Sequence, residues 1–139
     1  MTRQLTAHIS NPANDCLKIT VLDEPGSGKA NHAYLIEGYN SDSNPQQMLL
    51  GAELTCDNDQ EGVVLLFQDG PISEVGVNGI THEALLAVLI DRLQSFQAGP
   101  YSCRENALAL TKLEEALMWL NKRTQRRMAA GTEGTHEGD

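Results

Sequence analysis

The chain has 139 residues, 40% of them hydrophobic and 4% aromatic, with a formal net charge of −9. This length predicts one domain, and the apolar fraction is sufficient for a core. We see no signal peptide, no apolar run near the ~20 residues that cross a bilayer, and no overall positive charge of the kind that binds long nucleic acids, so neither a membrane nor a long nucleic acid is expected as a partner.

The charge is distributed unevenly along the chain. Residues 1–91 contain three basic and thirteen acidic residues, a net charge of −10, whereas residues 92–127 contain seven basic and three acidic residues, a net charge of +4. The basic residues are most simply a solvated helix surface, although a few arginines could still hold a small anion. Three cysteines, Cys16, Cys56 and Cys103, have no paired spacing, which fits a reducing cytoplasm.

The N-terminal part is patterned like an antiparallel sheet. Leu5 to Ile9 alternate in polarity and predict a short strand that Asn11-Pro12 ends. Residues 16–22 predict a second strand and residues 30–39 a returning strand, because both are rich in β-branched and aromatic residues. The Gly-rich segment 23–29 between them predicts the tip of a hairpin.

Two more strands are predicted before the helices. Residues 48–55 read as a third strand after the first hairpin, and a polar turn follows at residues 56–62. Residues 63–68, with the sequence VVLLFQ, form an apolar run of the length expected for a buried strand.

The segment from Phe67 to Glu83 joins the expected sheet to the expected helices. A seam of this kind is a natural place for a small-molecule pocket. It carries one aromatic ring, several glycines and one amide, Asn78, but no obvious catalytic group. The segment therefore favours a protein that binds a ligand rather than transforms it.

The first helix is expected from Thr81, as its N-cap, to about Gln97, with Glu83 in the first turn where the helix dipole favours an acid. Gly99-Pro100 then stops the helix. Its apolar stripe is predicted to consist of Leu86, Leu89, Leu93 and Phe96.

Ser102 and Glu105 predict a capping box for the second helix, which is expected to run to about Met128. The short linker predicts that the two helices pack as antiparallel neighbours. The apolar stripe of the second helix is predicted to be Leu110, Leu113, Leu117 and Leu120.

Three further apolar residues of the second helix lie off this stripe: Leu108, Met118 and Trp119. Because these side chains must also be shielded from solvent, they predict a homo-oligomer. The basic end of the helix, residues 122–127, is expected to overhang the hairpin or to pack on another subunit. The predicted fold class is α+β, a small antiparallel β-sheet followed by a two-helix antiparallel hairpin. In this single domain of residues 1–139, the sheet part is 1–72, the hairpin 73–128 and a disordered tail 129–139.

Motifs of enzymes and metal proteins are not matched. The segment Pro25 to Ala30 resembles a phosphate-binding loop, but Asp23 and Ala30 stand where that motif needs Gly and Ser or Thr, and no helix follows. The four histidines show no metal-ligand spacing with one another or with the cysteines. We therefore expect no catalytic residue, no metal and no cofactor.

Three residues favour a ligand site. A phenylalanine such as Phe67 most often belongs to the hydrophobic core of a protein. Because Phe67 lies beside Gly70-Pro71, its ring could instead stack on a base, an interaction that contributes ~1–3 kcal/mol to binding. Asn78 could bond a base or ribose, or could simply form an Asn-Gly turn. Arg104 opposes the dipole in the first turn of its helix, so it is either a phosphate ligand or an ordinary surface arginine.

Several segments resemble the phage Thoeris anti-defence sponge family, first type. They are FQDGPISEVGVNGITHEALLAVLIDRL, FQAGPYSCRENALALTKLEEALMWLNKRTQRR and GTEGTH, while LDEPGSGKANHAYLIEG resembles the N-terminal sheet region of that family. The resemblance covers about Ile19 to His136. It implies a small antiparallel sheet with a two-helix hairpin, shared in part with a phage anti-CBASS sponge.

The resemblance also implies a function. Members of the family are not enzymes; they bind a glycocyclic isomer of ADP-ribose made by bacterial immune TIR proteins and hold it away from its effector. Some members also bind cyclic di- or trinucleotides at separate sites. The implied protein is a homo-oligomer, a dimer or a hexamer built as a trimer of dimers, acting in the cytoplasm of the infected host cell.

By this resemblance, Phe67 and Asn78 correspond to an aromatic residue and an asparagine that hold the ADP-ribose ligand. We add Arg104 as a phosphate contact. The further candidate ligand-binding residues are Gln68, Lys29, Asn31 and His32.

The sequence is also compatible with two other functions. One is a non-enzymatic, oligomeric interaction module with no small-molecule ligand, in which the helical hairpin is the dimerisation device. The other is an enzyme that degrades the nucleotide, which would release altered ligand on denaturation, whereas a sponge releases it intact.

Overall fold

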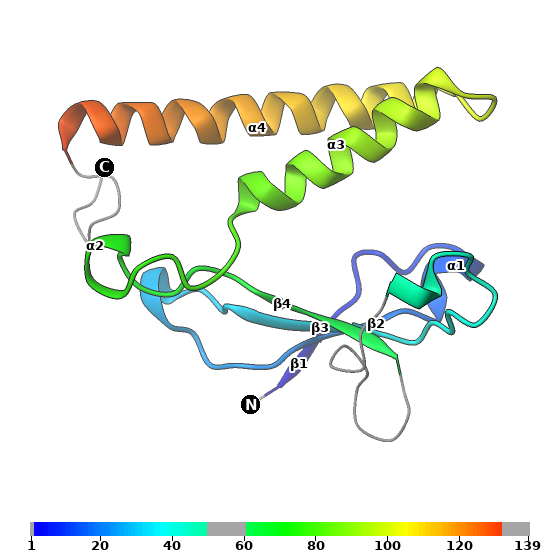
Figure 1. Cartoon of the computed structure of the whole chain (residues 1–139), viewed down its shortest axis with the longest axis horizontal. Helices are drawn as coiled ribbons and strands as arrows, with labels where there is room; N and C mark the ends of the chain where they lie inside the picture. The colour runs from blue at the N-terminus through cyan, green and yellow to red at the C-terminus, as the bar shows by residue number, and fades with distance from the viewer. Residues whose placement is uncertain (1, 50–60, 132–139) are drawn as a thin grey trace. The chain divides into compact units, whose positions relative to one another are not determined.

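The computed structural model describes residues 2–49 and 61–131, and its chain divides into two compact units, residues 1–69 and 70–139. The first unit contains a four-stranded antiparallel sheet and the second a pair of long helices (Figure 1). This is the α+β fold that the sequence predicts.

The sheet is a simple meander in which every strand pairs with its neighbour in the chain, in the order β1-β2-β3-β4. Its strands are β1 (Arg3–Leu5), β2 (Lys18–Val21), β3 (Ala33–Glu37) and β4 (Gly62–Leu66). The expected hairpin of β2 and β3 is confirmed, with Val21 opposite Tyr34 and Lys18 opposite Glu37.

One face of the sheet carries most of its apolar side chains, because alternate residues of a strand point to the same side. Cross-strand pairing aligns Leu5 with Ile19 and Ile19 with Ile36, and continues from Ile36 to Val63. On the same face, Val21 is fully buried between its partners in β1 and β3. The alternation that predicted these strands therefore also determines the sheet's core.

The N-terminal strand lies earlier in the chain than predicted. It spans Arg3–Leu5 and shares only Leu5 with the predicted segment. It ends at Leu5, and Asn11 begins the short helix α1 (Pro12–Asp15) where the sequence predicted only a strand end. The Asn11 side chain accepts a hydrogen bond from the Asn14 N–H at 3.0 Å, and proline suits the first helical position, so Asn-Pro here is a helix start.

The strand predicted at residues 48–55 is wrong where the structure can be compared with it. Met48 and Leu49 belong to a 3₁₀ turn (Gln47–Leu49), and both side chains are exposed. The remaining residues of that prediction, 50–55, and most of the turn at 56–62 lie outside the described part of the chain.

The strand expected at residues 63–68 is present as β4, but its expected burial is wrong. Val64 and Leu66 are 51% and 55% exposed. The reason is position, because β4 lies at an edge of the described sheet, where it pairs with β3 alone. An apolar run of this length cannot by itself distinguish a central strand from an edge strand.

The second unit opens with the short helix α2 (Ile72–Val75) and continues with α3 (His82–Ala98). The predicted N-cap is confirmed, since the Thr81 hydroxyl accepts a hydrogen bond from the Ala84 N–H at 3.1 Å. The predicted stripe needs correction at one position: Leu89 is 41% exposed, whereas its neighbour Ile90 is only 9% exposed.

The long helix α4 (Arg104–Ala130) runs antiparallel to α3 and packs beside it (Figure 1). The predicted stripe of Leu110, Leu113, Leu117 and Leu120 is partly buried, as expected. The helix ends at Gly131, which adopts the left-handed conformation at φ 74° and donates its N–H to the carbonyls of Arg127 and Met128. Residues 129 and 130 are therefore helical, and residues 132–139 of the predicted tail are not described.

The capping box predicted from Ser102 and Glu105 is wrong by one residue. The N-cap of α4 is Cys103, whose Sγ accepts a hydrogen bond from the Asn106 N–H at 3.4 Å. The Cys103 N–H in turn donates to Gln97 Oε1 at 3.1 Å, so a side chain at the end of α3 determines where α4 begins.

Candidate functional site

The seven predicted ligand-binding residues are divided between the two units. Five belong to the first unit, at the hairpin tip and the end of β4, and two belong to the second: Lys29, Asn31, His32, Phe67 and Gln68 in the first, Asn78 and Arg104 in the second. Each group is described within its own unit.

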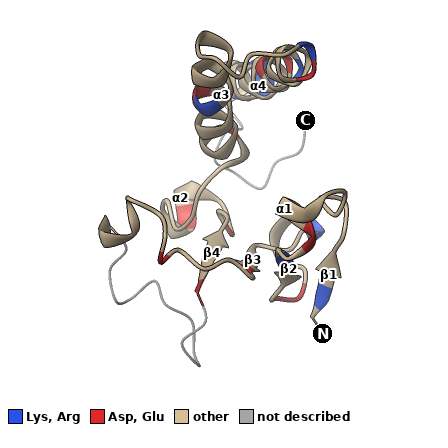
Figure 2. Ribbon diagram, turned by 90° about the vertical axis from the view of Figure 1, so that its right-hand side faces the viewer, with Lys and Arg blue, Asp and Glu red and all other residues tan. Residues whose placement is uncertain are grey.

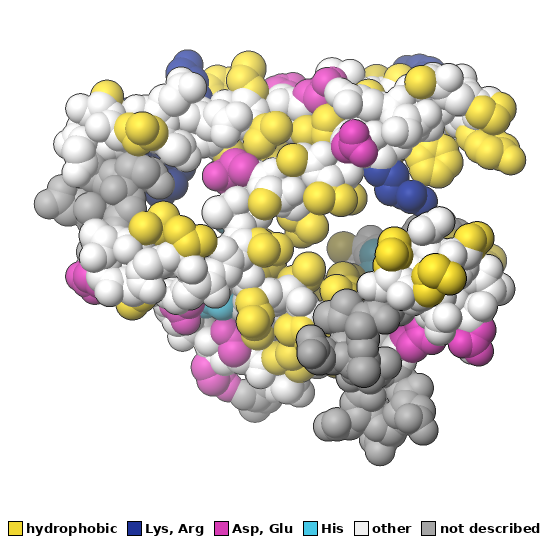
Figure 3. All heavy atoms as spheres, viewed as in Figure 1, with side chains coloured by type: hydrophobic (Ala, Val, Ile, Leu, Met, Phe, Trp, Pro, Cys, Tyr) yellow, Lys and Arg dark blue, Asp and Glu magenta, His cyan; other side chains and the backbone are white. Residues whose placement is uncertain are grey.

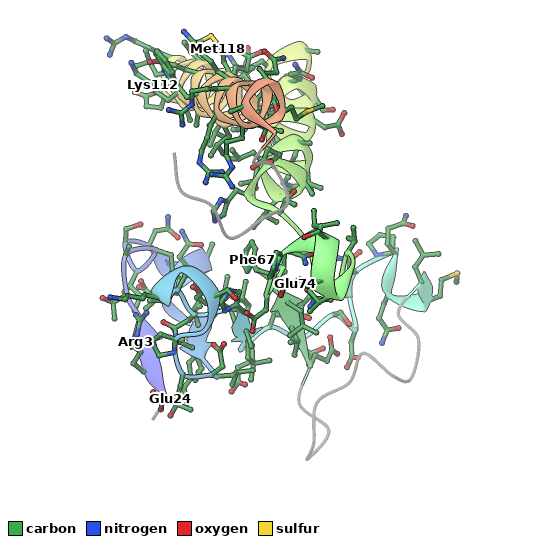
Figure 4. The ribbon with its side chains drawn as sticks, turned by 90° about the vertical axis from the view of Figure 1, so that its left-hand side faces the viewer. Arg3, Glu24, Phe67, Glu74, Lys112 and Met118 are labelled. Atoms are coloured by element: carbon green, nitrogen blue, oxygen red, sulfur yellow. The ribbon has the colours of Figure 1, made fainter. Side chains whose placement is uncertain are left out.

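Phe67 directly follows β4 and is half-buried (Figure 4). Its main-chain N–H donates to the His32 carbonyl at 2.8 Å, which extends the pairing of β3 and β4 by one residue. The edge of one ring meets the face of the other between Phe67 and Tyr34, with centroids 5.7 Å apart and planes at 88°. The ring is thus held by the sheet rather than carried on a free loop.

The His32 imidazole lies between two carboxylates, an arrangement that we call the Asp23–His32–Asp69 bridge. His32 Nδ1 is 3.9 Å from Asp23 Oδ2, and His32 Nε2 is 3.7 Å from Asp69 Oδ1. The His32 side chain is largely buried, whereas Asp69 is 52% exposed. Asp69 Oδ1 also accepts a hydrogen bond from the Ser27 N–H at 3.2 Å, which ties the hairpin tip to the chain after β4.

Asp23 is also bound by the main chain. Its carboxylate accepts hydrogen bonds from the N–H of His32, at 2.9 and 3.1 Å, and from the N–H of Ala33 at 3.1 Å. Partial burial raises the pKa of Asp23, but these N–H donors and the nearby His32 ring more than offset that effect, so the net pKa lies below its usual range. The carboxylate is therefore most stable in its charged form.

Sequence reasoning did not single out Asp23 and Asp69 as members of any site. The available signal was weak: Asp23 begins the Gly-rich loop and Asp69 comes two residues after the one candidate ring, next to Gly70-Pro71. Nothing in either position relates the two aspartates to each other or to His32, because that relation depends on the pairing of β2, β3 and β4.

The other hairpin-tip candidates already have contacts within the first unit. Asn31 Oδ1 accepts a hydrogen bond from Arg3 Nη2 at 2.9 Å, and Asn31 Nδ2 donates to the Asp23 carbonyl at 2.7 Å. Lys29 is exposed in the 3₁₀ turn (Ser27–Lys29) and takes a left-handed backbone conformation with φ 60°. The roles seen for Asn31 and His32 are structural, and Lys29 remains accessible.

In the second unit, Asn78 follows α2 and is exposed, and Arg104 is the first residue of α4 and is also exposed. The start of α4 presents backbone N–H groups of the kind that favour an anion, and the Cys103 thiol takes up one of them. Arg104 lies beside these N–H groups in the first turn of α4.

Surface depressions occur elsewhere in each unit. One of about 540 Å³ lies where α3 turns into α4, lined by Arg92, Phe96 and Tyr101 among others, with the Arg92 guanidinium 5.0 Å from the centre of the Phe96 ring. In the space-filling view, hydrophobic side chains gather at this end of the helix pair beside basic ones (Figure 3). Another of about 600 Å³ runs between α3 and α4 beside Ile90 and Leu117.

A third depression, of about 380 Å³, lies at the other end of the sheet from the hairpin tip, beside Lys18 and Glu37. None of the seven predicted ligand-binding residues lines any of these three depressions. Within residues 2–49 and 61–131, no three His, Cys, Asp or Glu side chains gather as a metal site would require. Of the helices that can be described, none combines the length and hydropathy needed to cross a bilayer.

Comparison with known proteins matches the C-terminal part of the chain. Residues 60–125 match the family model described as "Acb2/Tad1, hairpin domain". This span contains β4, α2, α3 and most of α4, and it includes Phe67, Asn78 and Arg104.

A curated relative is similar over part of its length. The chain is 62% identical over 71 residues to "Thoeris anti-defense 1" of Bacillus phage SBSphiJ7. The aligned segment is 51% of this chain and 50% of the relative, so the match spans about half the length of each.

Proposed function

We propose that the chain is a phage anti-defence protein of the Acb2/Tad1 kind, which binds a cyclic nucleotide immune signal and sequesters it without degrading it. The observation that carries the proposal is the 62% identity over 71 residues to the protein named Thoeris anti-defense 1. The family match over residues 60–125 supports the same assignment from an independent comparison.

The ligand in this proposal is a glycocyclic isomer of ADP-ribose, with cyclic di- or trinucleotides as further candidates. In the first unit, Phe67 is the candidate for stacking on an adenine. In the second unit, Asn78 is the candidate for hydrogen-bonding a base or ribose, and Arg104 for contacting a phosphate. Gln68, Lys29, Asn31 and His32 are the remaining candidates. A stacking ring, an amide and a guanidinium are suited to holding a nucleotide and supply no evident nucleophile or general base, which is why we propose sequestration rather than hydrolysis.

The charge distribution supports a small ligand. Acidic residues are spread over the ribbon of the sheet unit (Figure 2). Six of the ten basic residues lie on α4. A long nucleic acid would be repelled by so acidic a chain, whereas a small dianion needs only one or two basic contacts.

Sequestration works by mass action. The protein must bind the signal more tightly than the effector does, and it must be present above the concentration of the signal. A nanomolar Kd corresponds to about −12 kcal/mol, which stacking of one adenine and contacts to a pyrophosphate can supply in a preorganised site.

The test is thermal unfolding of the full chain with and without the glycocyclic ADP-ribose isomer, followed by chromatography of the ligand that heating releases. At ~100 times its Kd, the ligand should stabilise the fold by ~2.7 kcal/mol and raise the melting temperature. Recovery of intact ligand is the expected result. Altered ligand would identify an enzyme, and no shift with any cyclic nucleotide would contradict the proposal.

A second candidate function is an oligomeric interaction module with no small-molecule ligand. The observation that favours it is the exposure of Leu108, Met118 and Trp119 on α4, three large apolar side chains on one helix. This alternative predicts the same melting temperature with and without nucleotide.

A further inference from the structure

We propose that the Asp23–His32–Asp69 bridge positions Phe67 for ligand stacking, so that Asp23, His32 and Asp69 are positioning residues of the proposed nucleotide site. This inference rests on the proposed function for its ligand, while its structural part can be tested separately. All of the residues involved belong to the first unit.

On its N-terminal side, Phe67 is held by the pairing of β4 with β3. β4 pairs with β3 up to Leu66, which lies opposite Ala33, and the N–H of Phe67 then donates to the carbonyl of His32. The main chain of Phe67 is therefore bonded to the main chain of His32, whose own N–H donates to Asp23.

On its C-terminal side, Phe67 is held through Asp69. Asp69 follows Phe67 by two residues, a span of ~7 Å at full extension. Its carboxylate is fixed by the Ser27 N–H at 3.2 Å and lies 3.7 Å from His32 Nε2. With both ends of so short a segment held, the backbone at Phe67 has little freedom, and the ring remains against Tyr34.

The hairpin tip packs closely against the bridge at Gly26. A Cβ atom added at Gly26 would come within 3.1 Å of both carboxylate oxygens of Asp69 and within 3.2 Å of His32 Cε1. The backbone of the tip is thus packed directly on the charged groups. Asp23 completes the arrangement by accepting the N–H of His32 and of Ala33, which fixes the beginning of β3.

A ring whose backbone is held in this way is suited to stacking on a base. An aromatic ring contributes its ~1–3 kcal/mol per base only to the extent that its position is fixed before the ligand arrives, because ordering a mobile ring on binding costs part of that free energy. β4 lies at an edge of the described sheet and has exposed neighbours, so the contact with Tyr34 is supplemented by the hydrogen bonds that the two carboxylates of the bridge accept from the main-chain N–H groups of Ser27, His32 and Ala33.

The test compares the binding of the glycocyclic ADP-ribose isomer, by titration calorimetry, for the full-length protein and for Asp69→Asn. The amide oxygen of the substituted side chain can still accept the Ser27 N–H, but the negative charge beside His32 is lost. We expect the Kd to rise about tenfold, a loss of ~1.4 kcal/mol, with a nearly unchanged melting temperature because Asp69 is half exposed. Asp69→Glu, which keeps the carboxylate, should recover most of the affinity.

Two further variants serve as references. Phe67→Ala measures the full loss expected when the ring is removed. Asp42→Asn makes the same charge change at an exposed position of the same unit, outside the bridge, and should bind like the unaltered protein. Gly26→Ala is the independent variant, since it disturbs the bridge by volume rather than by charge, and it should also weaken binding.

A spectroscopic readout separates this inference from the proposed function. The chain has only two phenylalanines, so selective labelling resolves the Phe67 ring in an NMR spectrum. Asp69→Asn should shift the Phe67 ring signals while leaving those of Phe96 in place.

The outcomes are distinct. Unchanged Phe67 signals in Asp69→Asn overturn the inference, whether or not the ligand binds. Normal affinity in Asp69→Asn alongside lost affinity in Phe67→Ala also overturns it and leaves the proposed function intact. Full affinity in Phe67→Ala overturns it as well, because Phe67 would then not be the stacking ring. Failure of every cyclic nucleotide to bind contradicts the proposed function, and the Phe67 signals then decide the structural part alone.

Discussion

At the scale of single residues, the Asp23 carboxylate accepts hydrogen bonds from two backbone N–H groups and lies beside a histidine ring. Its pKa is lower in the folded protein than in the unfolded chain, so the charged form stabilises the fold. This stabilisation is present above the pKa of the unfolded chain and is lost as the pH falls through the lower pKa of the folded state.

We therefore predict that Asp23→Asn lowers the melting temperature at pH 7 and that the difference from the unaltered protein narrows in strong acid. Melting temperatures measured between pH 7 and pH 2 check this, with Asp42→Asn as the matched control at an exposed position. A constant difference across the whole range would show that the charge of Asp23 contributes nothing and that only its shape matters.

The limits of sequence reasoning at this scale are physical. Phe67 could be singled out because it is one of only six aromatic residues and lies at a predicted boundary. Asp23 and Asp69 could not be singled out in this way, because they are 46 positions apart in the sequence. Both come close to His32 only through the register of three strands. Local sequence patterns do not show which distant residues will surround a candidate ligand-binding residue in the folded protein.

At the scale of secondary-structure elements, the register of the buried stripe on α3 can be tested directly. Ile90 is 9% exposed and Leu89 is 41% exposed. Ile90→Ala should lower the free energy of unfolding by ~2–4 kcal/mol, because it removes a buried side chain and leaves a cavity, whereas Leu89→Ala should cost less than ~1 kcal/mol. Urea denaturation of both variants measures the two values, and equal losses would contradict the register described for α3.

The helices were predicted well in extent and less well in detail. A period of 3.6 residues allows an apolar row to continue by three or by four positions, so the sequence could not decide between Leu89 and Ile90 after Leu86. Similarly, both Ser102 and Cys103 precede the second predicted helix, so the sequence allowed either of them as its N-cap. In the structure the N-cap is Cys103, whose N–H donates a hydrogen bond to the Gln97 side chain. For β4, the sequence predicted a strand but could not show that it lies at an edge.

At the scale of the whole molecule, we propose that copies of the chain associate through the outer side of α4. Leu108 and Trp119 are separated by eleven residues, close to three full turns, so they project in nearly the same direction. Met118 and Lys112 also project from the helix pair (Figure 4), and Lys122 lies 5.2 Å from the centre of the Trp119 ring. Large apolar side chains on an exposed helix surface are typical of a protein–protein interface.

Trp119→Glu should therefore weaken self-association about 30-fold or more, the effect of losing ~2 kcal/mol at an interface hot spot. Sedimentation velocity over a range of protein concentrations measures this. Gln94→Glu on α3 is the control, since it adds the same charge at another exposed position. A single-chain mass for the unaltered protein at all concentrations would contradict the proposal.

The order of contacts along the chain has a consequence for how the protein forms. Each described strand pairs with the strand next to it in the sequence, and each long helix packs on the helix next to it, so each unit is built from consecutive residues. These contacts join elements that follow one another in the sequence, the longest connection being residues 38–61 between β3 and β4, and local contacts of this kind favour fast folding. The strands that the structure describes all lie within residues 1–69, so their sheet can form while the ribosome is still synthesising the helices.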